Sequence, residues 1–288
     1  MNAVELSHVQ KAFKGFAVQD LSFSVMEGSV CGLVGENGAG KSTTIRLLMG
    51  ALRRDGGDIR VLGTDPASPA FREVKEDIGI VLDDAYFPEV LTALQVGAVM
   101  KGTYRRWDGE QYRAYLERFE LPEKKPFKEY SRGMRMKLGI AAALSHHPKL
   151  LVLDEATAGL DPIIRDEVLE LFNEFTLPED HSILISSHIL SDLEKICDTI
   201  AFLHQGKLLF CEEKDRLLEQ YGLFAGTAEQ ADSLPPEAVT GRESSTYGGV
   251  RALVRRDLVP SGLELERPTV EDVILFMAKG AKKGERTA

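Results

Sequence analysis

Apolar and polar residues alternate in two stretches near the start of the chain, residues 3–9 and 21–25. Alternation is typical of strands with one buried face, so we expect the two stretches to pair in an antiparallel sheet. Residues 29–34 (SVCGLV) instead form a continuous apolar run, which indicates a fully buried strand. A glycine-rich segment leads from this run into a predicted helix over residues 42–49, which ends at Gly50.

Two further apolar runs, residues 150–153 and 182–185, are each followed by polar residues and then by a helical pattern. This order predicts a largely parallel sheet wound with helices, whose ligands bind at the carboxyl ends of the strands. Between residues 84 and 129 the chain changes to aromatic and charged helical segments, which predict a helical insertion.

The regular order of apolar runs and helical patterns ends at about residue 212. Val250, Ala252 and Val254 alternate with polar residues, which predicts an edge strand. Residues 269–278 have the apolar stripe of a small helix, and Thr269 with Asp272 forms a capping box at its start. We therefore predict a separate C-terminal domain over residues 216–288.

Composition limits the kind of protein this can be. With 288 residues, 43% of them hydrophobic and 28% charged, the chain can bury the core of a large α/β domain with an appendage. A formal net charge of −10 repels phosphate backbones and disfavours a nucleic-acid partner. The three cysteines fit no zinc template and no disulfide framework, which favours a reducing, cytosolic location. The sequence shows no signal peptide and no run of apolar residues long enough to span a bilayer, so membrane association would go through a partner.

The glycine-rich segment has the sequence pattern of a phosphate-binding loop. Residues 35–42 match G-x-x-x-x-G-K-[ST] between a strand and a helix. Glycines let backbone N–H groups face phosphate oxygens, and the helix N-terminus adds positive charge. Lys41 is expected to neutralise the β- and γ-phosphates and the Ser42 hydroxyl to ligate Mg²⁺. The predicted nucleotide-binding residues of this segment are Gly35, Asn37, Gly38, Ala39, Gly40, Lys41, Ser42 and Thr43.

Two acids end the apolar run at residues 150–153. A buried strand delivers Asp154 to the carboxyl edge of the sheet, where it can hold Mg²⁺ directly or through water. Glu155 comes next and can act as the general base that polarises an attacking water. Together with the phosphate loop, Asp154 and Glu155 predict a nucleoside triphosphatase.

Three more motifs follow in a definite order. Tyr-Ser-Arg-Gly-Met at residues 130–134 precedes a predicted helix, Ala-Gly-Leu-Asp at residues 158–161 follows Glu155, and Ile-Ser-Ser-His ends at His188. Their order and spacing resemble the ATPase subunits of ABC transporters over roughly residues 3–215. The resemblance implies a P-loop ABC cassette of the α/β class, with a mixed sheet wound with helices, an antiparallel β subdomain and a helical subdomain at about 84–135, plus a small α+β appendage.

The resemblance also implies roles for single residues. In this family two subunits face each other head to tail. Each ATP lies between the phosphate loop of one subunit and the signature segment of the other, which corresponds to residues 130–134 here. Ser131 and Gly133 would contact the γ-phosphate bound to the partner chain, which suits an anion site at a helix N-terminus. His188 would position the γ-phosphate and the attacking water, and Asp161 would shape the dimer seam.

An aromatic ring that stacks on adenine is also implied. Phe13, just before the second predicted strand, resembles that residue. Phe16 is an alternative, and so is an ordinary core role for Phe13.

The sequence departs from the family pattern at two places. The usual signature is Leu-Ser-Gly-Gly-Gln, and Tyr130, Arg132 and Met134 replace three of its residues while the serine and second glycine are kept. Asp83 stands where the family has a glutamine. An ionised aspartate accepts hydrogen bonds but donates none, and it can approach Mg²⁺ as an oxygen ligand. We hypothesise that coupling to the membrane partner differs here from the glutamine-bearing members.

Residues 104–108 (Tyr-Arg-Arg-Trp-Asp) are the most distinctive part of the helical insertion. In the family, the groove between this subdomain and the ATPase core receives a short helix of the transmembrane subunit, and Trp and Arg are favoured anchors of such interfaces. An inward-packed Trp107 is the alternative. Together with Asp83, this stretch resembles bacterial exporters of peptides and antimicrobial compounds.

The sequence thus predicts an ATPase domain over residues 1–215 that uses ATP and Mg²⁺. It would act as a dimer, homo- or heteromeric, bound to a transmembrane permease at the cytoplasmic face of the membrane. ATP would close the dimer and hydrolysis would reopen it. The alternatives are a soluble ATPase of the same superfamily acting on ribosomes or DNA, and a regulatory cassette with weak hydrolysis.

Overall fold

The computed structural model describes residues 1–83, 87–244, 249–260 and 262–285, with side chains up to residue 280. Asp84, where the predicted helical insertion begins, lies outside the described residues, as do parts of the predicted C-terminal domain.

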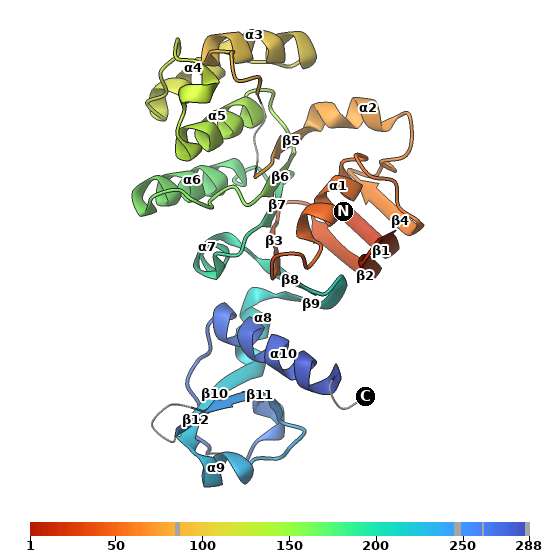
Figure 1. The fold of residues 1–288 in the computed structure, drawn as a ribbon, viewed down its shortest axis with the longest axis vertical. Coiled ribbons are helices and arrows are strands. Elements are labelled where there is room, and N and C mark those ends of the chain that lie inside the picture. The colour runs from red at the N-terminus through yellow and green to blue at the C-terminus, as the bar shows by residue number, and fades with distance from the viewer. Residues whose placement is uncertain (84–86, 245–248, 261, 286–288) are drawn as a thin grey trace.

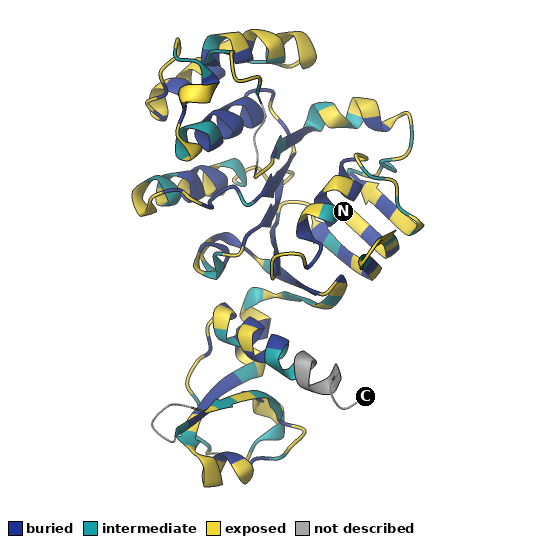
Figure 2. Cartoon of the chain, viewed as in Figure 1, coloured by how far each residue is buried: buried dark blue, intermediate teal, exposed yellow. Residues whose placement is uncertain are grey.

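A six-stranded sheet with the order β5-β6-β7-β3-β8-β9 forms the centre of the chain (Figure 1). Its strands run parallel except β9, which pairs antiparallel with β8. Strands β3, β6 and β7 are buried along their whole length, which explains their continuous apolar runs (Figure 2). The bounds are β3 Val30–Gly35, β5 Ile78–Val81, β6 Leu150–Asp154, β7 Ser182–Ser186, β8 Thr199–His204 and β9 Lys207–Glu213.

The antiparallel sheet predicted from the start of the chain is confirmed, with β4 as a third strand in the order β2-β1-β4. It lies on one side of the central sheet together with α1, and α5, α6 and α7 lie on the other (Figure 1). One apolar core fills each side. The elements are β1 Asn2–Phe13, β2 Phe16–Met26, α1 Lys41–Leu48, β4 Gly56–Val61, α2 Phe71–Val74 and a 3-10 turn Lys75–Asp77.

Helices follow β5, as the sequence predicted, and side chains cap three of them. Thr92 and Gln95 form a capping box for α3, Asp108 caps α4, and Ser131 caps α5. Helix α5 continues to Leu144, and its second half is buried against β5. The elements are α3 Ala93–Thr103, α4 Gly109–Arg118, a 3-10 turn Phe127–Glu129, α5 Arg132–Leu144, α6 Pro162–Phe175 and α7 Leu190–Ile196.

The end of the chain forms a small sheet with the order β10-β12-β11. The prediction of an edge strand at Val250 to Val254 is wrong, because β12 is paired on both sides. Alternation there reflects a sheet with one well-buried face, which a central strand shows as well as an edge strand. The elements are α8 Lys214–Gln220, β10 Tyr221–Thr227, α9 Ala228–Asp232, β11 Val239–Ser244, β12 Gly249–Arg255, a 3-10 turn Arg256–Leu258 and α10 Val270–Glu285.

Helix α10 confirms the predicted capping box, since the Asp272 N–H donates to Thr269 Oγ1 and the Thr269 N–H donates to the Asp272 carboxylate. The helix packs against α7, and Val273 and Phe276 share one apolar core with Leu193. The boundary at residue 215 stays a prediction. Within the described parts of the chain, no helix has both the length and the apolar character needed to cross a membrane.

The turn between β8 and β9 supports the glycine-rich loop. Gln205 (φ 48°) and Gly206 (φ 80°) have the two positive φ angles of a type I′ hairpin turn. The Gly206 N–H donates to the Ala39 oxygen at 3.0 Å, and the Gln19 N–H donates to the Gly206 oxygen at 2.8 Å. The turn therefore connects the loop to β2.

We expect Gly206→Ala to destabilise the protein by about 2–4 kcal/mol, because an added Cβ would lie 1.8 Å from the Ala17 oxygen. Urea unfolding of the full chain measures this change. Gly15→Ala is the matched control, since Gly15 also has positive φ (87°) but has no neighbour within 4 Å of the added Cβ. Equal losses for both variants would contradict the role of the close contact.

Candidate functional site

The glycine-rich loop leaves β3 and returns into α1, as the sequence predicted. Gly38 (φ 83°) and Gly40 (φ 115°) adopt backbone angles that favour glycine. A Cβ on Gly40 would also lie 3.2 Å from the Phe16 ring. Helix α1 begins at Lys41, so its first N–H groups face the loop.

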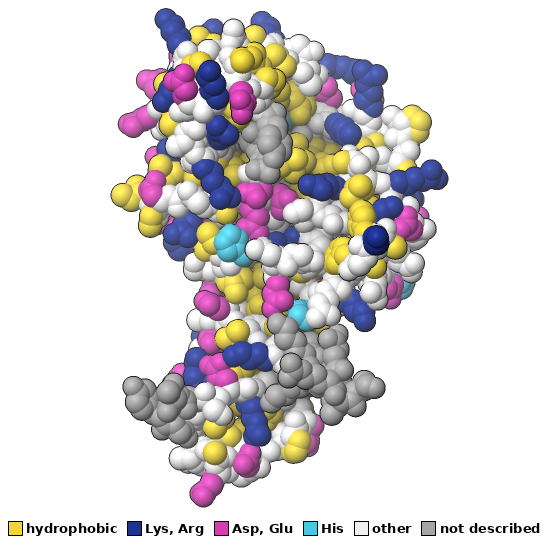
Figure 3. Space-filling model, in the orientation of Figure 1, with side chains coloured by type: hydrophobic (Ala, Val, Ile, Leu, Met, Phe, Trp, Pro, Cys, Tyr) yellow, Lys and Arg dark blue, Asp and Glu magenta, His cyan; other side chains and the backbone are white. Residues whose placement is uncertain are grey.

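A cavity of about 540 Å³ opens over this loop at the carboxyl ends of the central strands. Figure 3 shows acidic side chains gathered near the middle of this face, with a histidine beside them and Lys and Arg side chains around. The lining residues are Phe16, Asn37, Gly38, Gly40, Lys41, Ser42, Thr43, Asp83, Arg132, Glu155, Ala158 and His188.

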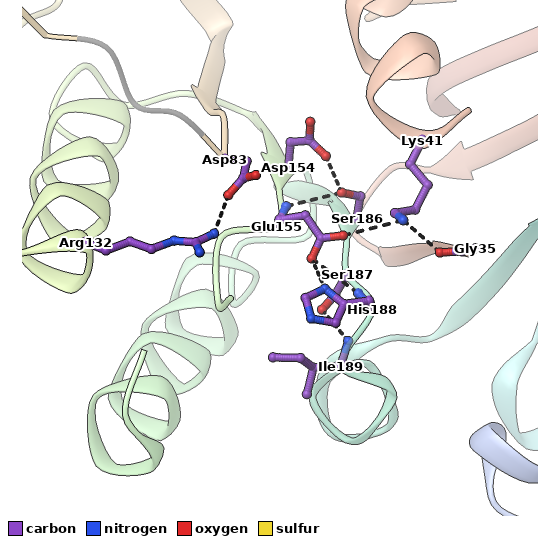
Figure 4. Close-up of polar contacts among 10 residues, drawn as sticks. All are labelled: Gly35, Lys41, Asp83, Arg132, Asp154, Glu155, Ser186, Ser187, His188 and Ile189. Atoms are coloured by element: carbon purple, nitrogen blue, oxygen red, sulfur yellow. Dashed lines mark hydrogen bonds and ion pairs between the residues drawn. The ribbon is translucent and has the colours of Figure 1, made fainter. Parts of the chain in front are cut away.

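Lys41, Glu155 and His188 form one charged cluster in this cavity (Figure 4). The Lys41 Nζ donates to the Gly35 oxygen at 2.7 Å and lies 3.5 Å from Glu155 Oε1. The other carboxylate oxygen, Oε2, is 2.6 Å from His188 Nδ1 and accepts from the His188 N–H at 3.3 Å. The Glu155 carboxylate is thus held between a cation of the phosphate loop and the histidine after β7.

Ser186 organises the two acids at the end of β6. Its hydroxyl donates to Asp154 Oδ1 at 2.5 Å, and the Glu155 N–H lies 3.2 Å from the same hydroxyl oxygen and 3.0 Å from the Ser186 carbonyl oxygen. Glu155 has φ 54°, a left-handed angle that a non-glycine residue adopts at a cost in free energy. These hydrogen bonds hold it there.

The structure brings most of the predicted residues together, but seven of them do not line the cavity. Gly35 and Ala39 are buried residues of the phosphate loop. Asp154, the last residue of β6, is 5% exposed. Ser131 and Asp161 are exposed N-caps of α5 and α6, and Gly133 lies in the first turn of α5. Phe13, 43% exposed, stacks on Phe16 at 6.4 Å between ring centroids. Of the two aromatic candidates, Phe16 is the one that lines the cavity, and adenine stacking stays a prediction.

Asp83 lies in the cavity wall, where its Oδ1 is 2.6 Å from Arg132 Nη2. The sequence identified both residues as departures from the family pattern without indicating that they meet. Ser186 was also missed, although its position one residue beyond the apolar run of β7 is a usable signal.

The sequence is similar to those of known proteins. Residues 18–158 match the ABC transporter family. The chain is 33% identical over 274 residues to the ABC transporter ATP-binding protein YhcH of Bacillus subtilis, covering 91% of this chain and 87% of the relative. The chain belongs to the ATP-binding subunits of ABC transporters. It is also 37% identical over 196 residues to the bacitracin transport ATP-binding protein BcrA of Bacillus licheniformis, covering 67% of this chain and 63% of that protein.

A solved ATP-binding subunit of an ABC transporter has the same fold, with a TM-score of 0.69 at 28% identity over 76% of this chain and 92% of that one. As an ABC ATP-binding subunit, the protein binds ATP, hydrolyses it and serves transport through separate membrane subunits. The cavity over the phosphate loop brings together Lys41, Glu155 and His188, three of the residues predicted from the sequence.

Proposed function

We propose that this ABC subunit hydrolyses Mg²⁺-ATP in the described cavity to drive export of a peptide or antimicrobial compound. The cluster of Lys41, Glu155 and His188 beside the phosphate loop carries the hydrolytic part of the proposal. The substrate class rests on the similarity to BcrA, whose name assigns it to bacitracin transport.

The donor atoms present fit Mg²⁺. Ser42 lines the cavity, and the Asp154 carboxylate has one oxygen engaged by Ser186. Hard oxygen donors of this kind suit Mg²⁺, which needs few protein ligands when substrate phosphates and water complete its shell. Ser42 and Asp154 would hold the ion, which would neutralise charge on the β- and γ-phosphates. Ligation by Asp83 stays a prediction.

Glu155 is placed to accept a proton from the attacking water. The water oxygen forms a bond to the γ-phosphorus, the bond to the bridging oxygen breaks, and ADP leaves with that electron pair. Lys41 would stabilise negative charge on the phosphates. His188 would keep the Glu155 carboxylate directed into the cavity through its Nδ1 and backbone N–H contacts.

A second cassette would complete the site. Ser131 and Asp161 are exposed at the starts of α5 and α6, and the N-terminus of a helix can face an anion or a partner chain. We infer that Ser131 and Gly133 face the ATP bound to the partner subunit, and that Asp161 lies at the interface between the two subunits. The dimer would be homo- or heteromeric.

The transmembrane subunit would dock at the helical side of the molecule. A groove of about 680 Å³ there is lined by Lys101, Arg105, Arg106 and Trp107, among others. Trp107 is half-buried with its ring 5.0 Å from that of Tyr112, so it packs inward and still contributes to the groove. This docking would place the protein at the cytoplasmic face of the membrane.

Tyr104, the residue before Arg105 of the groove, connects this region to the central sheet. Tyr104 stacks on His146 at 3.8 Å between ring centroids, and His146 Nε2 lies 3.1 Å from the oxygen of Ile78 on β5. Burial lowers the pKa of His146, so the ring is neutral at pH 7. This stack would transmit movement between the docking groove and the strand that leads to Asp83.

Purification of the tagged chain from its own host in mild detergent tests the transport assignment. We expect a stoichiometric integral membrane protein to co-purify. Recovery with ribosomes or DNA, or without any membrane protein, would overturn the assignment and leave the ATPase chemistry in place.

A further inference from the structure

Two charged clusters share the wall of the nucleotide cavity. Lys41, Glu155 and His188 form one, and Asp83 with Arg132 forms the other (Figure 4). Asp83 follows β5, whereas Arg132 is the first residue of α5, so the second cluster joins two segments far apart in the sequence. Both of its members line the cavity.

Arg132 also lies on the loop that follows Glu155. An added Cβ on Gly159 would be 3.1 Å from Arg132 Cδ and 3.2 Å from its Nε, so the side chain rests on the Gly159 backbone. Next to it, a Cβ on Gly133 would be 3.4 Å from Leu160 Cδ2. The start of α5 therefore covers this loop, and Ala158 of the same loop lines the cavity.

A carboxylate in this wall needs a cation. The cavity receives a triphosphate, and Lys41 is already shared between the Gly35 oxygen and Glu155. An unpaired Asp83 would repel the phosphates, because like charges that share one cavity repel each other. The Arg132 guanidinium compensates that charge at 2.6 Å.

We propose that Arg132 is a positioning residue for the nucleotide site of its own chain: it masks the Asp83 carboxylate and holds the Gly159 loop against α5. The inference rests on ATP binding in this cavity and adds Arg132 to the residues that govern it.

The role is separable from stability. Arg132 and Asp83 are 57% and 46% exposed, and ion pairs that exposed contribute little to folding. Loss of the pair should therefore change affinity for a polyanion without lowering the unfolding temperature. A purely structural pair would do the reverse.

Binding of Mg²⁺-ATP to the full chain tests the proposal, with Glu155→Gln as background so that ATP is not consumed. We expect Arg132→Ala to weaken binding about five- to tenfold, which corresponds to roughly 1–1.4 kcal/mol. Adding Asp83→Asn to Arg132→Ala should restore affinity to within about twofold. Asp83→Asn alone should leave binding unchanged or tighter, because it frees the Arg132 cation. Arg132→Lys should keep most of the affinity, because the charge remains.

Arg118→Ala is the matched control. Arg118 of α4 pairs with Glu174 of α6 at 2.9 Å, so it also joins the helical insertion to the core, but away from the cavity. It should leave binding unchanged. Unchanged binding by Arg132→Ala, or failure of the double variant to recover, would overturn the proposal. Weaker binding by Asp83→Asn would favour Asp83 as a metal ligand instead. If neither the unsubstituted chain nor the Glu155→Gln parent bound Mg²⁺-ATP, the nucleotide-site assignment would fail together with this inference.

Discussion

Glu155→Gln should lower ATP turnover at least about 100-fold and leave ATP binding intact, because the amide cannot accept the proton of the attacking water. The substitution keeps the shape of a side chain that lies between Lys41 and His188 and is 13% exposed. Removing one negative charge beside Lys41 also reduces repulsion of the phosphates. Phosphate release and nucleotide binding, measured on the same preparation together with the membrane partner, give the two quantities.

Glu170→Gln makes the same chemical change at an exposed position of α6 and should keep full turnover. Turnover by Glu155→Gln within tenfold of the parent would show that another group activates the water. Loss of nucleotide binding by Glu155→Gln would instead point to a structural role for this carboxylate at its left-handed backbone position.

Lys41→Ala should weaken ATP binding about 100-fold, since charge-assisted hydrogen bonds to phosphate are among the strongest that a side chain makes. Lys41 is 6% exposed and is held by the Gly35 oxygen, so its ammonium group points into the loop before any nucleotide arrives. Titration with Mg²⁺-ATP measures the loss.

A second variant separates two causes of that loss. Lys41→Ala leaves Glu155 without its nearby cation, and an uncompensated carboxylate could itself repel ATP. We expect the double variant Lys41→Ala, Glu155→Gln to remain weak, because the missing contact is to phosphate. Recovery of binding in the double variant would assign the effect to Glu155 repulsion.

Local patterns predicted the framework of this site well. The phosphate loop depends on residue spacing within a short segment, and the buried strands on continuous apolar runs, so both are visible in the sequence. Capping at Thr269 was predictable for the same reason, because the partner residue is three positions away.

Contacts between distant segments were not predictable in this way. Asp83 and Arg132 are 49 positions apart, and only the packing of α5 against the central sheet brings them to 2.6 Å. Phe13 and Phe16 are both aromatic residues at the β1–β2 turn, so a pattern cannot tell which one faces the cavity. Sheet order failed for β12, since alternation reports which face is buried and not how many neighbours a strand has.

Helix α10, the last helix of the chain, is seated on α7, which begins two residues after His188. Val273 and Phe276 are fully buried in the same core as Leu193. The predicted ATPase domain and C-terminal domain are therefore constrained to evolve together. A change of side-chain volume on α7 requires a compensating change on α10. Exchange of the C-terminal domain between relatives would give a folded protein only where the α7 surfaces of the two chains have the same shape.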